Sequence, residues 1–436
     1  MEKSVYIYTY GCQMNVHDSE KMIGLLSENG YKEAGTPAEA DLIIFNTCAI
    51  REKAEQKFYS QLGRIKTLKK KKKDLVIAVA GCVAQEMQKK VFTRAPHVDF
   101  IFGPQNIGLL PDLLKRGQKM SVDINPALAG EEFTAERGSR TRAWVSIMYG
   151  CNNFCSYCIV PYTRGREVSR PPSSIVAEIR DLKARGYREV TLLGQNVNSY
   201  RSDTDFKGLL RLVASVGLDR VRFVTSHPRD LTADLVDAIA ELPCLCEHIH
   251  LPLQSGSDRI LRAMNRGYDY ADYRKKIDML RERVPGIAIT SDIIVGFPGE
   301  SDEDYLETLH ALESIQYDGL FAFKYSKRRG TKAYSLEDQV PEIVKTTRLN
   351  RLLKLQDEMT LKKNLAYENG IVEILVEGRS ETDEGRLCGR TRSNKIVTIQ
   401  DNGDTEGDLV KVLIMKARMH SLEGIRTDKQ AQATRF

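Results

Sequence analysis

The sequence predicts an α/β protein in three parts: an N-terminal parallel-sheet α/β domain, a central partial (β/α)6 barrel and a small C-terminal β-barrel. Short apolar runs alternate with helical patterns in two series, one up to about residue 120 and one from about residue 140. After a long helical stretch that ends near residue 367, only short alternating strands separated by turn residues follow. These observations predict domains at residues 1–125, 137–367 and 368–436, with a polar linker over residues 131–142.

Each of three apolar runs in the first part ends next to a cysteine. The runs are short and rich in β-branched or aromatic residues, as buried parallel strands are, and a helix-like stretch follows each of them. The strands are expected at Val5–Gly11, Leu42–Thr47 and Leu75–Gly81, and the helices at Ser19–Asn29, Arg51–Lys69 and Gln85–Thr93. Cys12, Cys48 and Cys82 therefore follow strand carboxyl ends, where open α/β sheets bind ligands, and we expect them to converge on a metal site. The alternative is that all three are buried structural cysteines.

Six strand–helix units in the second part indicate the partial barrel, whose active site should lie at the carboxyl ends of its strands. The strands are expected at Ala143–Met148, Glu189–Leu193, Arg220–Thr225, Cys246–Leu251, Ile287–Val295 and Gly319–Tyr325. Helical stretches separate them, among them Ser174–Arg185, Leu231–Glu241, Tyr270–Arg283 and Glu303–Ile315. Polar segments that contain glycine or proline follow most of these strands, as expected for a binding site.

The segment after the first barrel strand holds Cys151, Cys155 and Cys158 in a C-x3-C-x2-C spacing. Three thiolates within so short a loop can hold three irons of a [4Fe–4S] cluster and leave the fourth iron open to a small chelating ligand. Zinc is the competing hypothesis, but a structural zinc site needs a fourth ligand, and no further Cys or His lies near this loop in the sequence. The spacing at a barrel strand end therefore favours a catalytic iron–sulfur cluster.

This cysteine spacing, with an aromatic residue before the last cysteine, resembles the radical S-adenosylmethionine superfamily. The resemblance implies that the open iron binds the amino and carboxylate groups of S-adenosylmethionine, whose reductive cleavage yields methionine and a 5′-deoxyadenosyl radical. It also implies that Tyr157 lies beside the adenine and that Gln195 and Asn196 stand where the family binds the methionyl amine. Gln254 and Asn265 are further candidates for contact with S-adenosylmethionine. Gln195 replaces an acidic residue that is common at its place, and a simple polar turn is the alternative for this segment.

The three-part organisation resembles the radical S-adenosylmethionine methylthiotransferases over nearly the entire chain. The segment Tyr10–Glu20 is similar to the bacterial branch that modifies N6-dimethylallyladenosine in tRNA. Segments 159–167, 193–200, 250–256 and 264–266 support the same branch. The ribosomal-protein branch and the threonylcarbamoyl-adenosine branch tend to have other residues after the first cysteine. The C-terminal part resembles the TRAM domain, an RNA-binding β-barrel.

The resemblance implies a tRNA modification enzyme, a transferase that methylthiolates carbon 2 of N6-(dimethylallyl)adenosine at position 37, on the 3′ side of the anticodon. One S-adenosylmethionine molecule would donate the methyl group and a second would supply the radical, while an auxiliary [4Fe–4S] cluster on Cys12, Cys48 and Cys82 provides the sulfur. Carbon 2 of adenine has no acidic proton and is not an electrophile, so radical chemistry suits it and no catalytic protein base is expected. The implied partners are a tRNA anticodon stem-loop and an external electron donor, with the sulfur donor left open.

Basic residues in two segments are candidates for RNA contact. Arg164, Arg166 and Arg170 follow the cysteine loop and could contact phosphate or substrate, with salt bridges at the rim of the core as the alternative. In the C-terminal part, a stretch without acidic residues offers one basic strand pair, with solvated surface charge as the alternative. Its cations are Arg386, Arg390, Arg392 and Lys395.

Composition and charge limit the classes of protein to which the chain can belong. The net charge of +6 lies entirely in the first 120 residues, where Lys69–Lys73 supplies five positive charges, a weak indication of nucleic acid. No run of about 18 apolar residues and no signal-peptide pattern occurs, so we expect a cytoplasmic protein without membrane contact. An odd count of nine cysteines argues against a disulfide framework, and Cys244, Cys246 and Cys388 are expected to be structural thiols.

Two rival hypotheses stay open at the level of sequence. The first is a methylthiotransferase of the threonylcarbamoyl-adenosine or ribosomal-protein branch. The second is a non-catalytic iron–sulfur protein that uses its C-terminal barrel to bind RNA.

Overall fold

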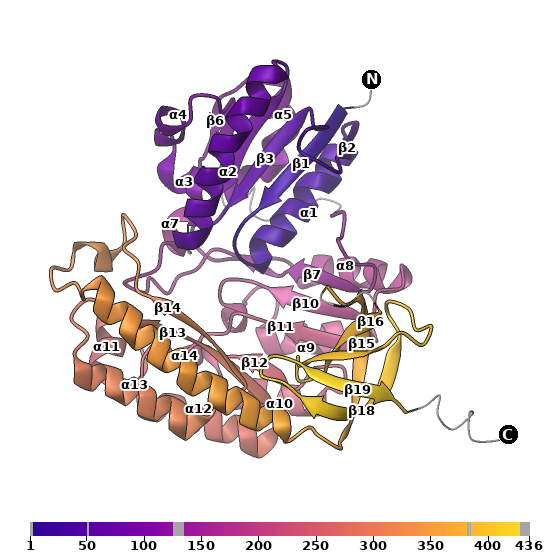
Figure 1. Cartoon of the computed structure of the whole chain (residues 1–436), viewed down its shortest axis with the longest axis vertical. Coiled ribbons are helices and arrows are strands. Elements are labelled where there is room, and N and C mark those ends of the chain that lie inside the picture. The colour runs from indigo at the N-terminus through magenta and orange to yellow at the C-terminus, as the bar shows by residue number, and fades with distance from the viewer. Residues whose placement is uncertain (1–2, 50–51, 125–134, 382, 384, 428–436) are drawn as a thin grey trace.

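The computed structural model describes residues 3–49, 52–124, 135–381, 383 and 385–427 of the 436-residue chain (Figure 1). An N-terminal α/β unit lies at the top of this view, a central unit of strands and helices lies below it, and an all-β unit lies at the lower right. The predicted three-part α/β fold is therefore confirmed. Residues 131–134 of the predicted linker lie outside the described residues.

A six-stranded parallel sheet in the order β2-β1-β3-β4-β5-β6 forms the N-terminal unit. Its strands are β1 (Lys3–Thr9), β2 (Tyr31–Glu33), β3 (Leu42–Thr47), β4 (Val76–Gly81), β5 (Phe100–Phe102) and β6 (Met120–Ser121). Its helices are α1 (Gln13–Ser27), α2 (Glu52–Lys71), α3 (Cys82–Met87), α4 (Lys90–Arg94) and α5 (Leu110–Arg116). Ile43 and Phe45 of β3 enter one hydrophobic cluster, and Leu42 and Ile44 enter another, so the sheet has a core on each face. The sequence pattern misses β2, β5 and β6, because runs this short show no periodicity.

The strand order of this sheet reverses between β1 and β3. Along the chain β1 is followed by β2 on one side, and β3 then lies on its other side. Loops that leave two such strands diverge to opposite faces of the sheet and leave a crevice between them, where open α/β sheets bind ligands. Cys12 follows β1 and Cys48 follows β3, so two cysteines flank this crevice. Strand β4, next to β3, ends directly before Cys82.

Six parallel strands form the wall of the central unit, in the orders β11-β10-β7 and β12-β13-β14. A bridge between Val221 and Leu245 joins the two groups, which confirms the predicted partial barrel of six units. The wall consists of β7 (Arg142–Ser146), β10 (Glu189–Leu193), β11 (Arg220–Phe223), β12 (His248–His250), β13 (Ala288–Val295) and β14 (Gly319–Lys324). A small antiparallel pair, β8 (Met148–Tyr149) and β9 (Val168–Ser169), flanks the short helix α7 (Val160–Thr163). The remaining helices are α8 (Pro172–Ala184), α9 (Phe206–Ala214), α10 (Ala233–Glu241), α11 (Asp258–Ala263), α12 (Tyr270–Arg283), α13 (Asp302–Ile315) and α14 (Glu342–Leu365).

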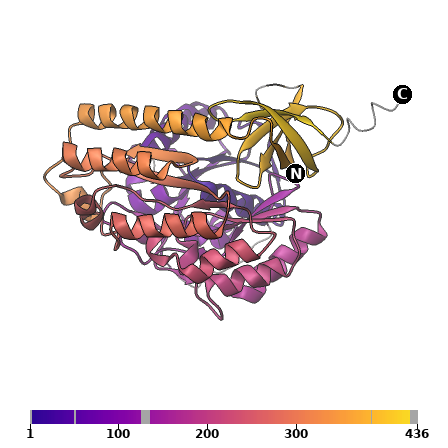
Figure 2. The same cartoon turned by 90° about the horizontal axis from the view of Figure 1, so that it is seen from below.

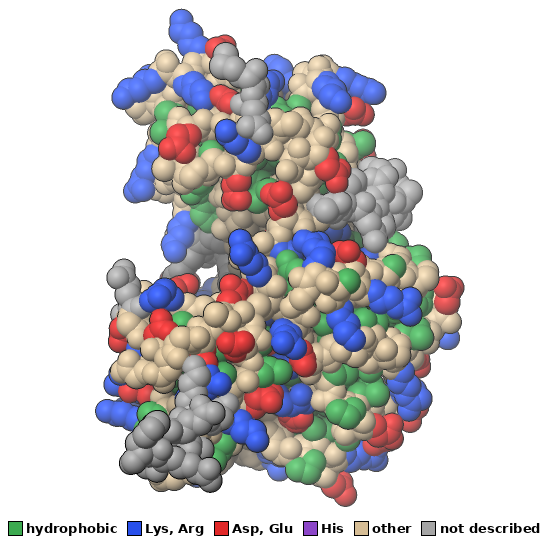
Figure 3. Space-filling view, turned by 90° about the vertical axis from the view of Figure 1, so that its right-hand side faces the viewer, with side chains coloured by type: hydrophobic (Ala, Val, Ile, Leu, Met, Phe, Trp, Pro, Cys, Tyr) green, Lys and Arg blue, Asp and Glu red, His purple; other side chains and the backbone are tan. Residues whose placement is uncertain are grey.

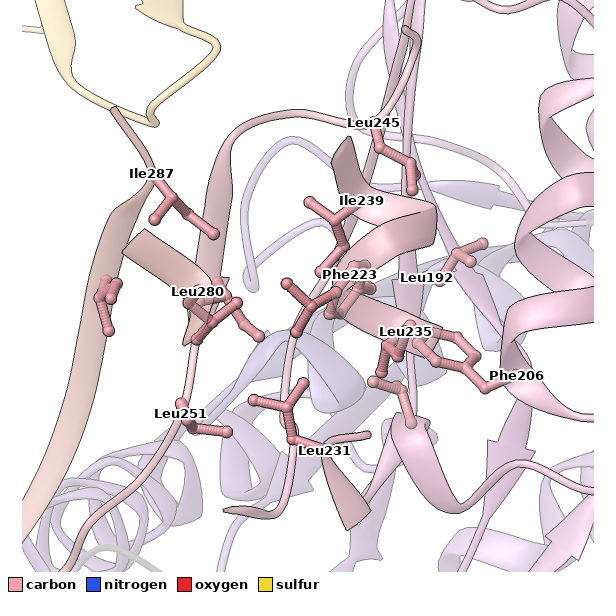
Figure 4. Packing of buried hydrophobic residues seen from close by; sticks show 14 of the residues in the cluster. Leu192, Phe206, Phe223, Leu231, Leu235, Ile239, Leu245, Leu251, Leu280 and Ile287 are labelled. Atoms are coloured by element: carbon pink, nitrogen blue, oxygen red, sulfur yellow. The ribbon is translucent and has the colours of Figure 1, made fainter. Parts of the chain in front are cut away.

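The helices cover the outer side of this wall, as the view from below shows (Figure 2). One large hydrophobic cluster joins them to the strands and includes Phe206 of α9 and Phe223 of β11, whose ring centroids lie 5.2 Å apart (Figure 4). In β14, Leu320 and Ala322 pack against this cluster. Phe321 alternates with them and faces the inner side of the wall, where it is 54% exposed.

A closed five-stranded barrel in the order β15-β16-β17-β19-β18 forms the C-terminal unit. Its strands are β15 (Ile371–Arg379), β16 (Arg386–Thr391), β17 (Ile396–Gln400), β18 (Leu409–Ala417) and β19 (Leu422–Arg426). Helix α14 leads into the barrel and ends at Leu365, close to the predicted end near residue 367. In the described part of the chain, no helix is long and apolar enough to cross a membrane.

Candidate functional site

Cys12, Cys48 and Cys82, here called the sheet cysteines, lie at one edge of the N-terminal sheet. Cys48 and Cys82 are buried, whereas Cys12, which precedes α1, is half-buried. Gly11 has a φ of +120°, and a Cβ atom there would stand 2.4 Å from the Cβ atom of Cys48. Only glycine fits at this position, and the loop that carries Cys12 therefore passes against Cys48.

Side-chain amides hold the start of α1 against the end of β3. Nδ2 of Asn15 donates to Oδ1 of Asn46 at 3.1 Å and to the carbonyl oxygen of Thr47 at 3.0 Å. Nδ2 of Asn46 donates in turn to the carbonyl oxygen of Asn15 at 2.7 Å. Because these groups are buried, the network fixes the loops of Cys12 and Cys48 relative to each other. Neither asparagine is a predicted site residue, although Asn15 closely follows Cys12 and Asn46 closely precedes Cys48.

Cys151, Cys155 and Cys158, here called the barrel cysteines, lie on a loop that follows β8. Gly150 has a φ of +72°, and a Cβ atom there would stand 2.0 Å from a backbone carbonyl oxygen. Cys151 and Cys155 are buried and Cys158 is half-buried. Backbone hydrogen bonds hold the loop against other segments of the central unit. The loop therefore presents its three thiols as a preformed set of ligands. The hydrogen bonds join Cys151 to Gly165, Ser156 to Met264 and Ala333 to Ser156 at 2.7–3.1 Å.

The two cysteine sets approach each other through α7, the short helix that follows Cys158. Helix α7 packs against α3, the helix that begins at Cys82. Arg164 at the end of α7 reaches into the N-terminal unit, where its guanidinium lies 2.6 Å from the carboxylate of Asp18. Burial raises the pKa of Cys82, and the nearby Arg164 opposes that shift. The carboxyl edge of the sheet and the carboxyl edge of the barrel therefore meet at this contact.

The donor sets suit iron–sulfur clusters better than a single metal ion. In the residues that the structure describes, no three Cys, His, Asp or Glu side chains come together as ligands of one ion. Cysteines that hold a cubane cluster each bind a different iron and stand farther apart than that. Burial and the neighbouring Cys155 raise the pKa of Cys158 to about 12, so a thiolate there needs a cationic partner.

Arg266 points one N–H group at a barrel cysteine. Its Nη1 atom lies 3.2 Å from Sγ of Cys155 and 3.3 Å from the hydroxyl of Tyr157. Its Nε atom donates to the hydroxyl of Tyr268 at 3.0 Å, and Nη2 donates to the carbonyl oxygen of Pro252 at 3.2 Å. The guanidinium is buried and held from several sides, so its position against the sulfur is well defined. In the sequence Arg266 stands out only within a family segment, because Cys155 and Tyr157 lie more than 100 positions away from it.

Tyr157 and Asn265 both brace the barrel cysteine loop. The ring of Tyr157 packs against a small hydrophobic cluster that contains Phe297 and Tyr325. Asn265 has a φ of +58° and donates to the carbonyl oxygen of Phe154 at 3.2 Å. Contact of these two side chains with S-adenosylmethionine stays a prediction.

Buried polar atoms without partners gather at the carboxyl ends of β10, β11 and β12. Among the described residues, both amide atoms of Gln195 lack a hydrogen bond. One polar atom also lacks a hydrogen bond in each of Ser226, His227 and Gln254. Such an atom costs about 1–3 kcal/mol when it stays unpaired, so this place suits a polar ligand. Asn196 differs, because its amide accepts from the N–H of His227 at 3.1 Å and donates within the protein. The structure therefore gives Asn196 a supporting position beside the predicted ligand contacts.

The arginines after the barrel cysteines divide between interior and surface. Arg164 is 4% exposed and faces Asp18, and Arg170 is buried with its guanidinium on Glu178. For these two, the structure favours the salt-bridge alternative over RNA contact, which is a correction of the prediction for Arg164. Arg166 is exposed and lies over the ring of Phe154 at 4.3 Å, and its contact with RNA stays a prediction.

The predicted basic strand pair of the C-terminal barrel is neutralised by acids from elsewhere in the chain. The local excess of positive charge is thus balanced, because a count along one segment does not include carboxylates that the fold brings to it, while contact of these residues with RNA stays a prediction. Figure 3 shows cationic and anionic side chains interspersed on the side of the molecule that faces right in Figure 1. The pairs are Arg386 with Glu423 at 3.5 Å, Arg390 with Glu377 at 3.1 Å, Arg392 with Glu247 at 2.7 Å and Lys395 with Asp318 at 3.6 Å.

The same hairpin docks the C-terminal barrel on the central unit. Arg220 of β11 donates to the carbonyl oxygen of Arg390 at 2.7 Å, and Arg222 donates to those of Thr391 and Arg392 at 2.7 Å. These arginines lie at the start of β11, at the opposite end of the strands from the barrel cysteines. The hairpin therefore serves as an interface within the chain.

Family models match the three units of the chain in order. The Uncharacterized protein family UPF0004 matches residues 4–103, the Radical SAM superfamily matches residues 145–312 and the TRAM domain matches residues 365–425. Among solved structures, the radical S-adenosylmethionine methyltransferase TsrM from Kitasatospora setae has a TM-score of 0.58 at 14% identity, and the match covers 77% of each chain. The cobalamin-dependent radical enzyme OxsB has a TM-score of 0.54 at 12% identity, over 82% of this chain and 56% of that one. These two likenesses show the fold alone.

Curated relatives match the chain from end to end. The tRNA-2-methylthio-N(6)-dimethylallyladenosine synthase of Thermodesulfovibrio yellowstonii is 51% identical over 97% of this chain and 98% of that protein. The synthase of the same name from Carboxydothermus hydrogenoformans is 49% identical over 97% of this chain and 99% of that protein. With identity at this level over nearly its whole length, the chain belongs to the tRNA-2-methylthio-N(6)-dimethylallyladenosine synthase family of radical S-adenosylmethionine enzymes.

Proposed function

We propose that this protein installs a methylthio group at carbon 2 of N6-(dimethylallyl)adenosine at position 37 of tRNA. Membership of the synthase family supports the reaction, since relatives with that name cover nearly the whole chain. The structural observation that supports the site is the packing of α7 on α3, which joins the edge of the barrel cysteines to that of the sheet cysteines. A base held at this junction would lie within reach of both sets.

We assign one [4Fe–4S] cluster to the barrel cysteines and an auxiliary one to the sheet cysteines. When bound, these clusters and S-adenosylmethionine supply a carbon radical, a methyl group and sulfur. The protein would hold the polar end of S-adenosylmethionine with both amide atoms of Gln195 and with Oε1 of Gln254, which have no partner among the described residues. Burial lowers the pKa of His227 to about 2, so its ring is neutral beside them. Asn196 keeps the backbone of His227 in position through the hydrogen bond described above.

The inner face of β12–β14 is our candidate surface for the target base. Phe321 is 54% exposed on this face, and its ring centroid lies 5.9 Å from that of His250. Nδ1 of His250 lies 3.0 Å from the hydroxyl of Thr290, which orients the ring. Aromatic faces stack unpaired bases, and the exposed ring of Phe321 also suits contact with a dimethylallyl group. The adenine must leave the stack of the anticodon loop to reach this face, which costs little in a single-stranded loop.

Nucleoside analysis tests the proposed reaction directly. Anaerobically reconstituted protein with S-adenosylmethionine, a strong reductant and tRNA that carries N6-dimethylallyladenosine is expected to form the 2-methylthio nucleoside, measured by mass spectrometry. The matched control is the same tRNA without the dimethylallyl group. If the methylthiolated product formed from threonylcarbamoyl-adenosine or from a ribosomal-protein peptide, and not from the dimethylallyl substrate, the protein would belong to another branch of the methylthiotransferases. Absence of 5′-deoxyadenosine from protein with a full iron content would favour a non-catalytic RNA-binding role.

Changing Arg266 to Gln is expected to make the reduction potential of the cluster on the barrel cysteines more negative. Arg266 supplies a positive charge and an N–H group 3.2 Å from Sγ of Cys155, and both favour the reduced cluster. A redox titration followed by electron paramagnetic resonance measures the potential. Arg266→Lys, which keeps the charge, should shift it less. A Gln variant that has full iron content and the wild-type potential would contradict this role.

A further inference from the structure

A basic cleft opens beside the two cysteine sets and has no part in the chemistry described above. It has a volume of about 500 Å³ and lies between α3 and α4 of the N-terminal unit and the segment 327–334 that follows β14. Lys90 and Arg94 line it from the N-terminal unit, and Lys327, Arg329 and Tyr334 line it from the central unit. Two units of the fold therefore supply cations to one recess.

Positive charge exceeds negative charge in this cleft. Glu55 and Glu86 are the acids among its lining residues, and Glu55 is paired with Arg328 at 3.2 Å. Burial and the neighbouring Glu55 raise the pKa of Glu86, which favours its neutral form. Within the described residues, no carboxylate lies at ion-pair distance from the exposed side chains of Lys90, Lys327 and Arg329. Uncompensated cations on the walls of a recess attract an anion.

The walls of the cleft are connected to the segments that carry both cysteine sets. Helix α3, which lines one wall, begins at Cys82. The opposite wall is tied to the loop of the barrel cysteines, because the N–H of Ala333, next to Tyr334, donates to the carbonyl oxygen of Ser156 at 2.7 Å. A ligand in the cleft would therefore lie beside the place where the two edges meet.

We propose that this cleft binds the phosphodiester backbone of RNA next to the target nucleotide. The guanidinium groups of Arg94 and Arg329 match the geometry of phosphate oxygens, and Lys90 and Lys327 add point charges. The ring of Tyr334 is 40% exposed beside them, and a positively charged groove with an exposed aromatic ring is the usual surface for single-stranded nucleic acid. The inference rests on the proposed function, since it takes tRNA as the substrate.

The other basic segments of the chain are less suited to hold RNA at the site. The hairpin at Arg390–Lys395 is paired with acids and docked on the central unit. The run Lys69–Lys73 lies at the end of α2, a helix of 20 residues and therefore about 30 Å long that begins near Cys48. Within that run, Lys69 and Lys72 already pair with Asp99 and Asp41. Unlike the hairpin and the lysine run, the cleft is basic on walls from two units, and these walls connect to both cysteine sets.

The test compares two variants that each remove three positive charges. Reconstituted full-length protein is titrated against a fluorescent anticodon stem-loop RNA at several salt concentrations. K90Q/K327Q/R329Q is expected to bind about tenfold more weakly. The slope of log Kd against log salt should fall by about 2, because each phosphate that the protein no longer neutralises lowers it by about 0.7. K70Q/K71Q/K73Q, which changes exposed lysines at and just beyond the remote end of α2, should keep the wild-type affinity and slope.

Formation of 5′-deoxyadenosine without RNA checks that each variant is folded and holds its cluster, and the single variants K327Q and R329Q replace the triple one if it does not load iron. Unchanged affinity and slope in the cleft variant would overturn the proposal, and so would an equal loss in both triple variants. Tight binding of a poly-glutamate peptide that competes with RNA in wild type but not in the cleft variant would assign the cleft to an acidic protein instead. If RNA binding depends on the cleft but no methylthio product forms, the proposed function fails and the cleft assignment stands.

Discussion

Replacing Cys12, Cys48 and Cys82 together with alanine is expected to remove about half of the iron and all of the methylthiolated product, while formation of 5′-deoxyadenosine continues. The sheet cysteines follow the ends of β1, β3 and β4 in the N-terminal unit. The barrel cysteines lie on a loop that backbone hydrogen bonds tie to Met264 and Ala333 of the central unit. Because the two sets depend on different supports, one can be removed while the other keeps its shape.

Iron and sulfide analysis, chromatography of 5′-deoxyadenosine and nucleoside mass spectrometry measure these three outcomes on the same preparation. The converse variant, alanine at all three barrel cysteines, should also lose about half of the iron but should form neither 5′-deoxyadenosine nor product. Alanine at Cys244 and Cys388 is the matched control, since these half-buried thiols belong to neither set and should leave iron and product unchanged. Loss of all iron in the sheet-cysteine variant would mean one shared site instead of two.

The features that sequence predicts well here are those that repeat along the chain. β3 and β10 occupy the predicted residues, because continuous apolar runs bounded by turn signals identify buried parallel strands. The place of the sheet cysteines at one edge of the sheet also follows from pattern, since the carboxyl ends of parallel strands share that edge. The first barrel strand is less regular, because the predicted run Ala143–Met148 divides into β7 and β8 at Ile147.

The features that sequence predicts poorly are partnerships between distant residues. The residues around Arg392 in the sequence indicate a surface cation, yet Arg392 pairs with Glu247 of the central unit. The role of Arg266 likewise depends on Cys155, which lies 111 positions away and comes near it only in the folded chain. The segment 324–332, which contributes to the basic cleft, does show a run of cations in the sequence, but only the fold brings it opposite Lys90 and Arg94. Charge is therefore informative here only after each cation has been matched with its acid.

Arg164 and Asp18 join the N-terminal and central units through a buried ion pair. Their side chains are 4% and 2% exposed, and the distance from Nη2 to Oδ2 is 2.6 Å. Such a pair adds little stability relative to apolar side chains, because desolvation offsets the attraction, but removal of one partner leaves the other charge buried and unpaired. Changing Arg164 to Leu is therefore expected to destabilise the junction of the two units by about 3–5 kcal/mol.

Urea unfolding followed by the fluorescence of Trp144 measures this effect, since the one tryptophan lies on β7, a strand that contacts α1 of the N-terminal unit. Comparison of midpoints is the suitable readout, because a chain of three units need not unfold in one step. Arg166→Leu is the matched control: its side chain is exposed on the ring of Phe154, and the change should cost less than about 0.5 kcal/mol. The double variant Arg164→Leu with Asp18→Leu should recover part of the loss, because no unpaired charge stays buried. If the double variant were as unstable as Arg164→Leu alone, an unpaired carboxylate could not be the cause, and packing rather than charge would hold the two edges together.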